Sequence, residues 1–327
     1  MKLDFNDPQT RYLIDYANLK QGIIKYQSHF LSEKKLQEFV KKPHYGFPLV
    51  LPVGIKYFRY NKKFTFIIEK KKFMKKIFGI NKKDYIGAKI FFNFGNKFSY
   101  NVELKQKYQK HCKYINDYNE KLIRKVELLK KKYYLSSFQT RNVPHYGHEE
   151  IIKRLIRKRG KVFINPLIGM KKRGDFKNEI LRKIFNNLIK NVEYKNKVLF
   201  GPFIANMHYA GPREAIHHLN LREMIGFDRF TIGRDHAGAE NIYKPLDAFN
   251  YVKKFSKKMK IDIFAHKGSY FCKSCDKIVL RTDCKHKNLQ EISGSEFRGK
   301  ILSKTNFTYA RRSTQKYIYT LKNKLFY

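Results

Sequence analysis

Two histidines three residues apart, His145 and His148, stand in a polar segment that begins at Gln139 and reads QTRNVPHYGH. An apolar run precedes the segment and an amphipathic one follows it, so we expect a turn between a strand and a helix. The first turn of a helix presents unpaired N–H groups and a partial positive charge, which suit a phosphate. Arg141 adds a planar fork for an oxyanion, and Gly147 lets a bulky ligand approach the backbone. The segment predicts an anion site; a polar turn with two surface histidines is the alternative.

Two further polar motifs have the composition of a binding site. The sequence GRDHAG, from Gly233 to Gly238, directly follows an apolar run that ends at Ile232. Arginine, aspartate and histidine packed into such a tight loop are costly in a core and useful in an anion site. The sequence HYAGPRE, from His208 to Glu214, is also explained as a helix start, because proline suits the first helical position and glutamate stabilises the N-terminus.

The cysteines predict a metal site. Cys272, Cys275, Cys284 and His286 form the pattern C-x2-C-x8-C-x-H. Three thiolates and one imidazole are a closed tetrahedral ligand set for a structural Zn²⁺. Free buried cysteines or a redox-active C-x-x-C pair are the alternatives, and the remaining Cys112 is expected to be buried.

Strands alternate with helices in the second part of the chain, which predicts an α/β fold with a doubly wound parallel sheet. In such a sheet, ligands bind beyond the carboxyl ends of the strands, where both polar turns fall. The expected strands are residues 133–138, 161–164, 197–200 and 227–232, and the expected helices are residues 149–159, 178–190 and 212–224.

The first part of the chain has the pattern of a smaller, β-rich unit. Short apolar runs bounded by proline, glycine, asparagine and lysine predict strands at 47–53, 64–68 and 88–92. Apolar residues at helical spacing then predict a helix over 110–132. We expect the helix to close a domain of residues 1–134 and to lead into a catalytic domain of residues 135–327.

Composition excludes several classes of protein. The chain has 327 residues and is 16% aromatic, which rules out wholesale disorder. No apolar run approaches the ~20 residues of a membrane span, the first ten residues lack a secretory signal, and four cysteines are too few for a disulfide scaffold. We therefore expect a cytoplasmic protein.

The net charge of +44 suggests a polyanionic partner, but the charge is spread over the chain. Residues 1–134 carry +20 and residues 135–327 carry +24. Lysine, asparagine, isoleucine, phenylalanine and tyrosine are all abundant and share A/T-rich codons, so compositional drift also explains the charge. Nucleic-acid binding is possible but not favoured, because no recognised nucleic-acid motif accompanies it.

Taken together, the motifs resemble those of ATP sulfurylase (sulfate adenylyltransferase) of the bacterial type. Val143 replaces a proline of the family's first motif, and the GRDHAG motif matches without change. The matching segments, in order, are residues 139–148, 165–169 with 174–175, 209–215, 233–238 and 292–298.

The resemblance implies a fold and a reaction. It implies a PUA-like N-terminal domain, then a Rossmann-like catalytic domain of the HxGH nucleotidylyltransferase kind. A small zinc-binding insertion at about 270–287 and a helical C-terminal segment at 290–327 would complete it. The implied reaction is MgATP + sulfate → adenylyl sulfate (APS) + pyrophosphate, and a homo-oligomer, such as a dimer, is implied as well.

The resemblance also implies residue roles. Gln139 and Arg141, with the backbone at Ala237, would bind sulfate. Arg234 would stabilise phosphate charge, and Gly233 and Asp235 would face the nucleoside. The residues that would hold the triphosphate and the leaving pyrophosphate are Thr140, Asn142, His145 and His148.

Two other functions stay open from the sequence. One is a nucleotidylyltransferase with a different acceptor, such as a sugar phosphate. The other is a catalytically weak paralogue whose basic surface binds RNA or another polyanion. The segment 294–301 nearly matches a P-loop, but Ile301 lacks the hydroxyl that would bind Mg²⁺, and we expect no APS kinase domain after it.

Overall fold

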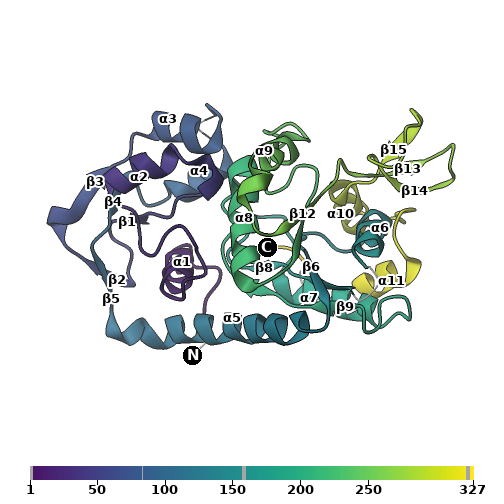
Figure 1. The fold of residues 1–327 in the computed structure, drawn as a ribbon, viewed down its shortest axis with the longest axis horizontal. Helices are drawn as coiled ribbons and strands as arrows, with labels where there is room; N and C mark the ends of the chain where they lie inside the picture. Colours follow the sequence, from purple (N-terminus) through teal and green to yellow (C-terminus); the bar gives the residue numbers. More distant parts are fainter. Residues whose placement is uncertain (1–2, 83, 157–159, 322–324) are drawn as a thin grey trace.

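A five-stranded parallel sheet forms the centre of the second part of the chain (Figure 1). The computed structural model describes residues 3–82, 84–156, 160–321 and 325–327. The strands lie in the order β12-β11-β6-β7-β9, and every neighbouring pair is parallel. Their bounds are β6 Tyr134–Phe138, β7 Gly160–Ile164, β9 Val198–Phe200, β11 Arg229–Ile232 and β12 Asp262–Ala265. The predicted parallel sheet is confirmed, with β12 as a strand that the sequence did not indicate.

The strand order creates a switch point between β6 and β11. From β6 the chain continues on one side through β7 and β9, and it then returns to build β11 and β12 on the other side. Crossovers that leave in opposite directions open a crevice at the carboxyl ends of the two central strands. The two polar turns identified in the sequence begin at this crevice, after Phe138 and after Ile232.

Helices link the strands, close to where the sequence places them. The helix predicted at 149–159 begins earlier, at Tyr146, because His145 caps it, and it ends at Leu155; residues 157–159 lie outside the described residues. The helix α8 ends at Gly226, whose φ of 101° suits glycine. The linking helices are α6 Tyr146–Leu155, α7 Asn178–Ile189, α8 Gly211–Ile225 and α9 Asp247–Phe255.

The N-terminal part contains more helix than strand among its described residues, so the β-rich prediction is wrong. The strand predicted at 88–92 is part of the helix α4, in which Ala88 and Phe91 are buried one helical turn apart. Phe73 stacks on Phe91 at 4.2 Å between ring centroids, and this packing favours the helix. The helices are α1 Thr10–Lys20, α2 Glu33–Val40, α3 Lys70–Phe73, the π-helical turn Met74–Phe78 and α4 Ile86–Phe91.

Two small antiparallel sheets accompany these helices. Of the run predicted at 47–53, only Leu51–Pro52 is a strand, whereas the strand predicted at 64–68 is present as Thr65–Ile67. The first sheet has the order β1-β4-β3 and the second pairs β2 with β5. The strands are β1 Leu51–Pro52, β2 Phe58–Tyr60, β3 Thr65–Ile67, β4 Lys97–Ser99 and β5 Val102–Leu104.

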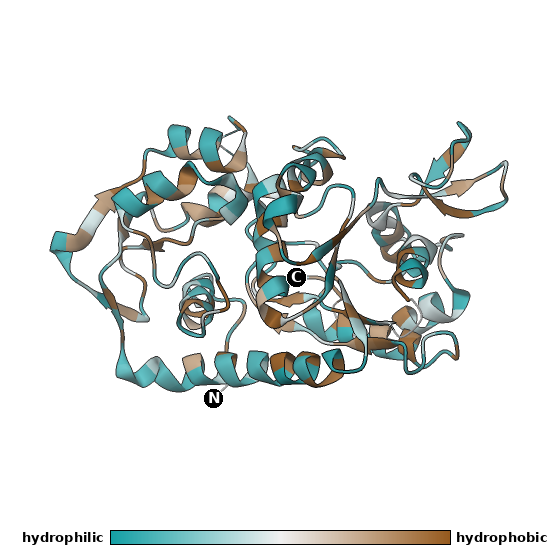
Figure 2. Ribbon diagram, viewed as in Figure 1, coloured by the Kyte–Doolittle hydropathy of each residue, from teal (hydrophilic) through white to brown (hydrophobic). Residues whose placement is uncertain are grey.

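The long helix α5, Gln109–Lys130, confirms the helix predicted at 110–132 and runs along the molecule beneath both parts (Figure 1). Its buried residues include Ile115, Leu122 and Val126, and hydrophobic residues become more frequent toward the C-terminal end of the helix (Figure 2). One hydrophobic cluster extends from Leu13 in α1 to Phe230 in β11. The domain boundary at residue 134 stays a prediction.

The C-terminal part adds a three-stranded antiparallel sheet and two helices, which confirms the predicted helical end. The sheet has the order β14-β13-β15, with β13 Ser269–Cys272, β14 Lys277–Leu280 and β15 Leu289–Glu291. The helices are α10 Gly294–Leu302 and α11 Arg312–Thr320. Among the described residues, no helix is long and apolar enough to cross a membrane.

Candidate active site

The cleft at the switch point gathers all ten residues that the sequence assigned to catalysis or substrate binding. Six come from the turn after β6 and four from the turn after β11. They are Gln139, Thr140, Arg141, Asn142, His145, His148, Gly233, Arg234, Asp235 and Ala237. The two turns are about ninety residues apart in sequence, and the parallel sheet brings them to one edge.

The two histidines of the first turn are neutral and close together. The Nδ1 atom of His145 caps α6 by accepting a hydrogen bond from the backbone N–H of His148 at 3.3 Å. The two rings stack with centroids 3.8 Å apart. Burial lowers the pKa of His145 well below its ordinary value, and burial lowers the pKa of His148 to about 4. At neutral pH each imidazole therefore offers one N–H donor and no charge.

Position 147 needs a glycine because the first turn of α6 packs closely against the C-terminal antiparallel sheet. A Cβ atom on Gly147 would lie 2.1 Å from Oγ of Ser269, at the start of β13, and 3.0 Å from Nδ1 of His145. From the sequence, we expected this glycine to let a ligand approach the backbone. The structure adds a second reason, which is that β13 packs directly against the first turn of α6.

Arg141 belongs to a cationic cluster around one buried carboxylate. Its Nη2 atom donates to the backbone carbonyl of Gly238 at 3.0 Å, and its Nη1 atom lies 3.5 Å from Oδ2 of the fully buried Asp175. Nη1 of Arg298 and Nζ of Lys172 lie 3.6 Å and 3.8 Å from the other carboxylate oxygen. Three cations thus face one anion, and all three line the cleft, which leaves an excess of positive charge for an anionic ligand.

The second turn has a strained backbone. Asp235 and Ala237 have φ values of 50° and 58°, in the left-handed region that residues with a side chain rarely adopt. The carbonyl of Ala237 accepts a hydrogen bond from the N–H of Gly211 at 3.2 Å, and the N–H of Asp235 donates to Pro245 at 2.9 Å. Strain of this kind is common at binding sites, where the surrounding contacts maintain it.

Arg234 is held by a residue of the C-terminal antiparallel sheet. Its guanidinium forms an ion pair with Glu291 of β15. Arg234 therefore connects the turn after β11 to the sheet that carries the cysteines. Hydrogen bonding to Glu291 raises the pKa of Arg234 above its already high value, so the side chain stays charged.

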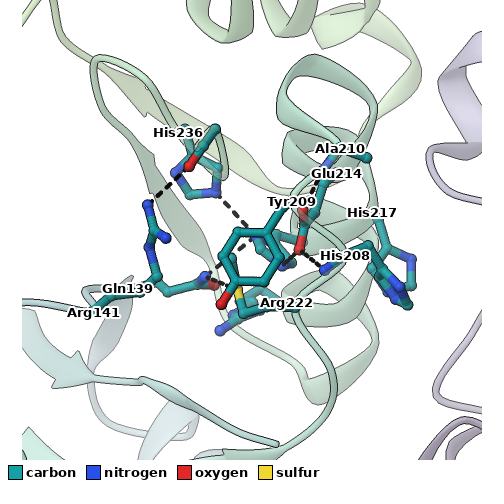
Figure 3. A network of polar contacts seen from close by, with 12 residues as sticks. Gln139, Arg141, His208, Tyr209, Ala210, Glu214, His217, Arg222 and His236 are labelled. Atoms are coloured by element: carbon teal, nitrogen blue, oxygen red, sulfur yellow. Dashed lines mark hydrogen bonds and ion pairs between the residues drawn. The ribbon is translucent and has the colours of Figure 1, made fainter. Parts of the chain in front are cut away.

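Gln139 lies at the inner end of the cleft, where its amide meets the helix α8 (Figure 3). Its Nε2 atom is 3.3 Å from Nδ1 of His218 and 3.6 Å from Sδ of Met207. The figure also shows His236, of the second turn, on the same side of the helix. The first turn and the second turn therefore meet the same helix.

Other residues that line the cleft were not predicted to have a role, among them His266, Arg298 and Lys172. His266 follows β12, and its backbone N–H donates to Ile232 at 3.1 Å, so it joins the same edge of the sheet. Arg298 and Lys172 come from segments that lie far from both turns in sequence. Arg298 lies in the matched motif at 292–298, and this motif could have indicated a role for it. His266 follows a strand that was not predicted from the sequence, so no sequence pattern pointed to it.

The cysteines and His286 form one cluster with the dimensions of a metal site. The four ligand atoms lie within 4.8 Å of one another. Sγ of Cys272 is 3.6 Å from Sγ of Cys284, and Nδ1 of His286 is 3.4, 3.2 and 3.5 Å from the sulfurs of Cys272, Cys275 and Cys284. A tetrahedral Zn²⁺ with ordinary bond lengths separates two sulfurs by about 3.8 Å and a sulfur and a nitrogen by about 3.6 Å. The donor set therefore fits Zn²⁺.

The sheet order, the crevice at the switch point and the basic, histidine-rich lining define a Rossmann-like α/β protein with an anion-attracting cleft. The model of the ATP-sulfurylase family matches residues 120–308, which is more than half of the chain. The chain belongs to the ATP-sulfurylase family.

Individual relatives carry the name of this family, and one solved structure shares the fold. Sulfate adenylyltransferases from Ignicoccus hospitalis and Pyrococcus abyssi are each 39% identical, over 170 and 168 residues. Each match covers 51% of this chain and 44% of the relative, so the matched part is less than half of those proteins. The structure named hexameric APS kinase from Thiobacillus denitrificans has a TM-score of 0.57 at 12% identity, covering 98% of this chain and 63% of that one, and shares the fold.

Proposed function

We propose that this chain catalyses the transfer of an adenylyl group from MgATP to sulfate, which yields APS and pyrophosphate. The observation that carries the proposal is the convergence of ten residues from two distant turns in one cleft. The names of the matched relatives, sulfate adenylyltransferases, support the same reaction.

The reaction needs positioning and charge stabilisation more than proton transfer. A sulfate oxygen attacks the α-phosphorus of ATP in line, and a new P–O bond forms. The bond between the α-phosphorus and the bridging oxygen breaks, and its electron pair leaves with pyrophosphate. Sulfate is already deprotonated at neutral pH, so the step requires no general base. Oriented reactants and donors aimed at the developing charge then supply the rate enhancement.

Each residue has a proposed part in this step. Arg141, the amide of Gln139 and the backbone N–H of Ala237 bind sulfate. Gly233 and Asp235 face the nucleoside. The remaining groups bind the triphosphate and the leaving pyrophosphate: Thr140, Asn142, His145, His148 and Arg234.

The neutral state of the two histidines suits this role. With Nδ1 of His145 accepting from the backbone, the ring carries its proton on Nε2 and can donate only there. A neutral donor stabilises charge on a phosphate oxygen without giving up its proton. The positive charge comes from Arg141, Arg298 and Lys172, which surround Asp175.

Mg²⁺ would arrive with ATP, and Zn²⁺ would be structural. Mg²⁺ usually keeps several waters and needs few protein ligands. Among the described cleft residues, Asp235 and Glu240 are the carboxylates that could reach its waters. The cluster at Cys272 would hold Zn²⁺ and fix the sheet that supplies Glu291 to Arg234. We also propose a homo-oligomer, which the hexameric assembly in the name of the structural neighbour supports.

The proposal is tested by direct detection of the product. Purified protein is incubated with MgATP, sulfate and inorganic pyrophosphatase, and APS is separated by ion-exchange chromatography. APS that appears only when both substrates are present supports the proposal. Adenylylation of a sugar phosphate in place of sulfate would instead favour a different acceptor.

A further inference from the structure

One buried imidazole contacts both cleft turns. His218, on α8, is fully buried. Its Nδ1 atom lies 3.3 Å from Nε2 of Gln139, in the first turn, and 3.0 Å from Nε2 of His236, in the second turn. Its Nε2 atom lies 3.2 Å from Oε1 of Glu214. The ring therefore links the two turns at the switch point.

The protonation of this ring follows from its neighbours. Burial lowers the pKa of His218 well below its ordinary value, so the ring is neutral and has one donor and one acceptor. An amide nitrogen can only donate, so Nδ1 of His218 accepts from Gln139 and its proton lies on Nε2, next to Glu214. Glu214 in turn accepts from the backbone N–H groups of His208 and Ala210, both at 2.8 Å.

The contact fixes which face of the Gln139 amide can meet an anion. One N–H of the amide points to His218. The second N–H has the weak acceptor Sδ of Met207 at 3.6 Å, so it is free to donate to a stronger acceptor. If the amide turned over, its oxygen would face the anion and repel it.

We propose that His218 is a positioning residue, which holds the Gln139 amide in its donor orientation and joins the two turns that form the sulfate pocket. This inference rests on the proposed function, in which Gln139 binds sulfate. His218 acts through Gln139 and His236 and does not itself touch the substrate.

The neighbouring His217 provides a matched control. It is 2% exposed and lies on the same helix, but its Nδ1 atom contacts the hydroxyl of Tyr26, at 2.7 Å, in the N-terminal part. A variant at His217 disturbs a buried histidine of the same helix without touching the two cleft turns.

Two substitutions at His218 separate positioning from size. In His218→Asn the side-chain oxygen takes nearly the place of Nδ1 and still accepts from Gln139. In His218→Gln the amide reaches the place of Nε2 and leaves no acceptor at Nδ1. Glutamine is closer to histidine in size, so a role in packing alone predicts that glutamine is the better replacement, whereas positioning predicts the opposite order.

The experiment measures kcat and the KM values for sulfate and ATP in the wild type, His218→Asn, His218→Gln and His217→Gln. Sulfate binding is measured in parallel by isothermal titration calorimetry, and folding by circular dichroism. We expect His218→Gln to raise the KM and Kd for sulfate at least tenfold and the KM for ATP less than twofold. We expect His218→Asn to stay within threefold of the wild type and His217→Gln to change neither KM.

Each contrary outcome has a definite meaning. Equal effects of the two His218 substitutions, a better glutamine variant, or the same loss in His217→Gln would overturn the positioning role. If one His218 variant does not fold, the other is compared with His217→Gln in the same way. A wild type that binds sulfate without turnover would refute the proposed reaction, and the order of Kd values would still decide the inference. A wild type that does not bind sulfate would overturn both.

Discussion

Replacing Gly147 by alanine tests the fit between α6 and the C-terminal sheet. The added Cβ would lie 2.1 Å from Oγ of Ser269 and 3.0 Å from both Cβ of Ser269 and Nδ1 of His145. Ordinary van der Waals contact begins at 3.4 Å. The 2.1 Å contact forces the Ser269 hydroxyl out of its place, and the two 3.0 Å contacts require α6 or β13 to move by a few tenths of an ångström.

The size of the effect follows from this crowding. Extra atoms in a closely packed region cost about 1–3 kcal/mol of the free energy of unfolding. A displacement of about 1 Å in a group that positions a substrate reduces the rate by up to about 100-fold. The expected displacement is a few tenths of that distance, at the end of α6 that carries His145 and His148, so we expect kcat/KM to fall roughly 3- to 10-fold, or about 0.6–1.4 kcal/mol in activation free energy.

The assay combines urea unfolding with steady-state kinetics of APS formation in a double-mutant cycle. Ser269→Ala removes the atom at 2.1 Å and leaves the contacts at 3.0 Å, so the double variant should recover part of the lost activity. Gly299→Ala, in α10, is the control, because a Cβ there meets nothing within 4 Å. Wild-type activity in Gly147→Ala, or no recovery in the double variant, would refute this account of the packing.

Three further predictions concern charge, metal and pH. Arg141→Ala should lower the rate of adenylyl transfer at least roughly tenfold, or ~1.4 kcal/mol, because sulfate then loses its proposed cationic ligand and the cleft loses one of the three cations around Asp175; an unchanged rate in a folded variant would contradict this. Elemental analysis should find one Zn²⁺ per chain, lost in Cys272→Ser and kept in Cys112→Ser; a folded wild type without metal would contradict the site. The folded-state pKa of His148, about 4, lies below its unfolded value, so its contribution to the free energy of unfolding is lost as pH falls from 6.5 to about 4. The wild type should therefore lose stability relative to His148→Asn in that pH window. A difference in the free energy of urea unfolding that stays constant with pH would contradict the burial of His148.

The sequence was sufficient for the parallel sheet and for both polar turns. In the second part of the chain, short apolar runs alternate with segments whose apolar residues recur at helical spacing. Such spacing is a local property of the chain and can be read from the sequence alone. The N-terminal part is different. The helix α1 buries Arg11, Asp15 and Asn18, so its polar residues do not mark a solvent-exposed face. Their partners are distant, as in the contact of Asp15 with Nδ2 of Asn206 at 2.6 Å, and no local pattern reveals such pairs.

In the candidate site, too, local features were predicted from the sequence and contacts between distant segments were not. The residues within each turn were found because their types and order are informative by themselves. His218 and Asp175 were not assigned a role, because the first acts by bridging two turns and the second by facing three cations from separate segments. Gly147 was recognised, but its contact with Ser269 depends on a sheet more than one hundred residues later.

We propose that the cleft between β6 and β11 is where an adenylyl group is transferred to sulfate. The most direct measurement is the exchange of labelled pyrophosphate into ATP by the purified, zinc-loaded protein, with and without sulfate, and with Arg141→Ala as the control. We expect exchange that requires sulfate and that falls at least roughly tenfold in the variant. Exchange without sulfate, or no exchange from a folded wild type, would contradict it.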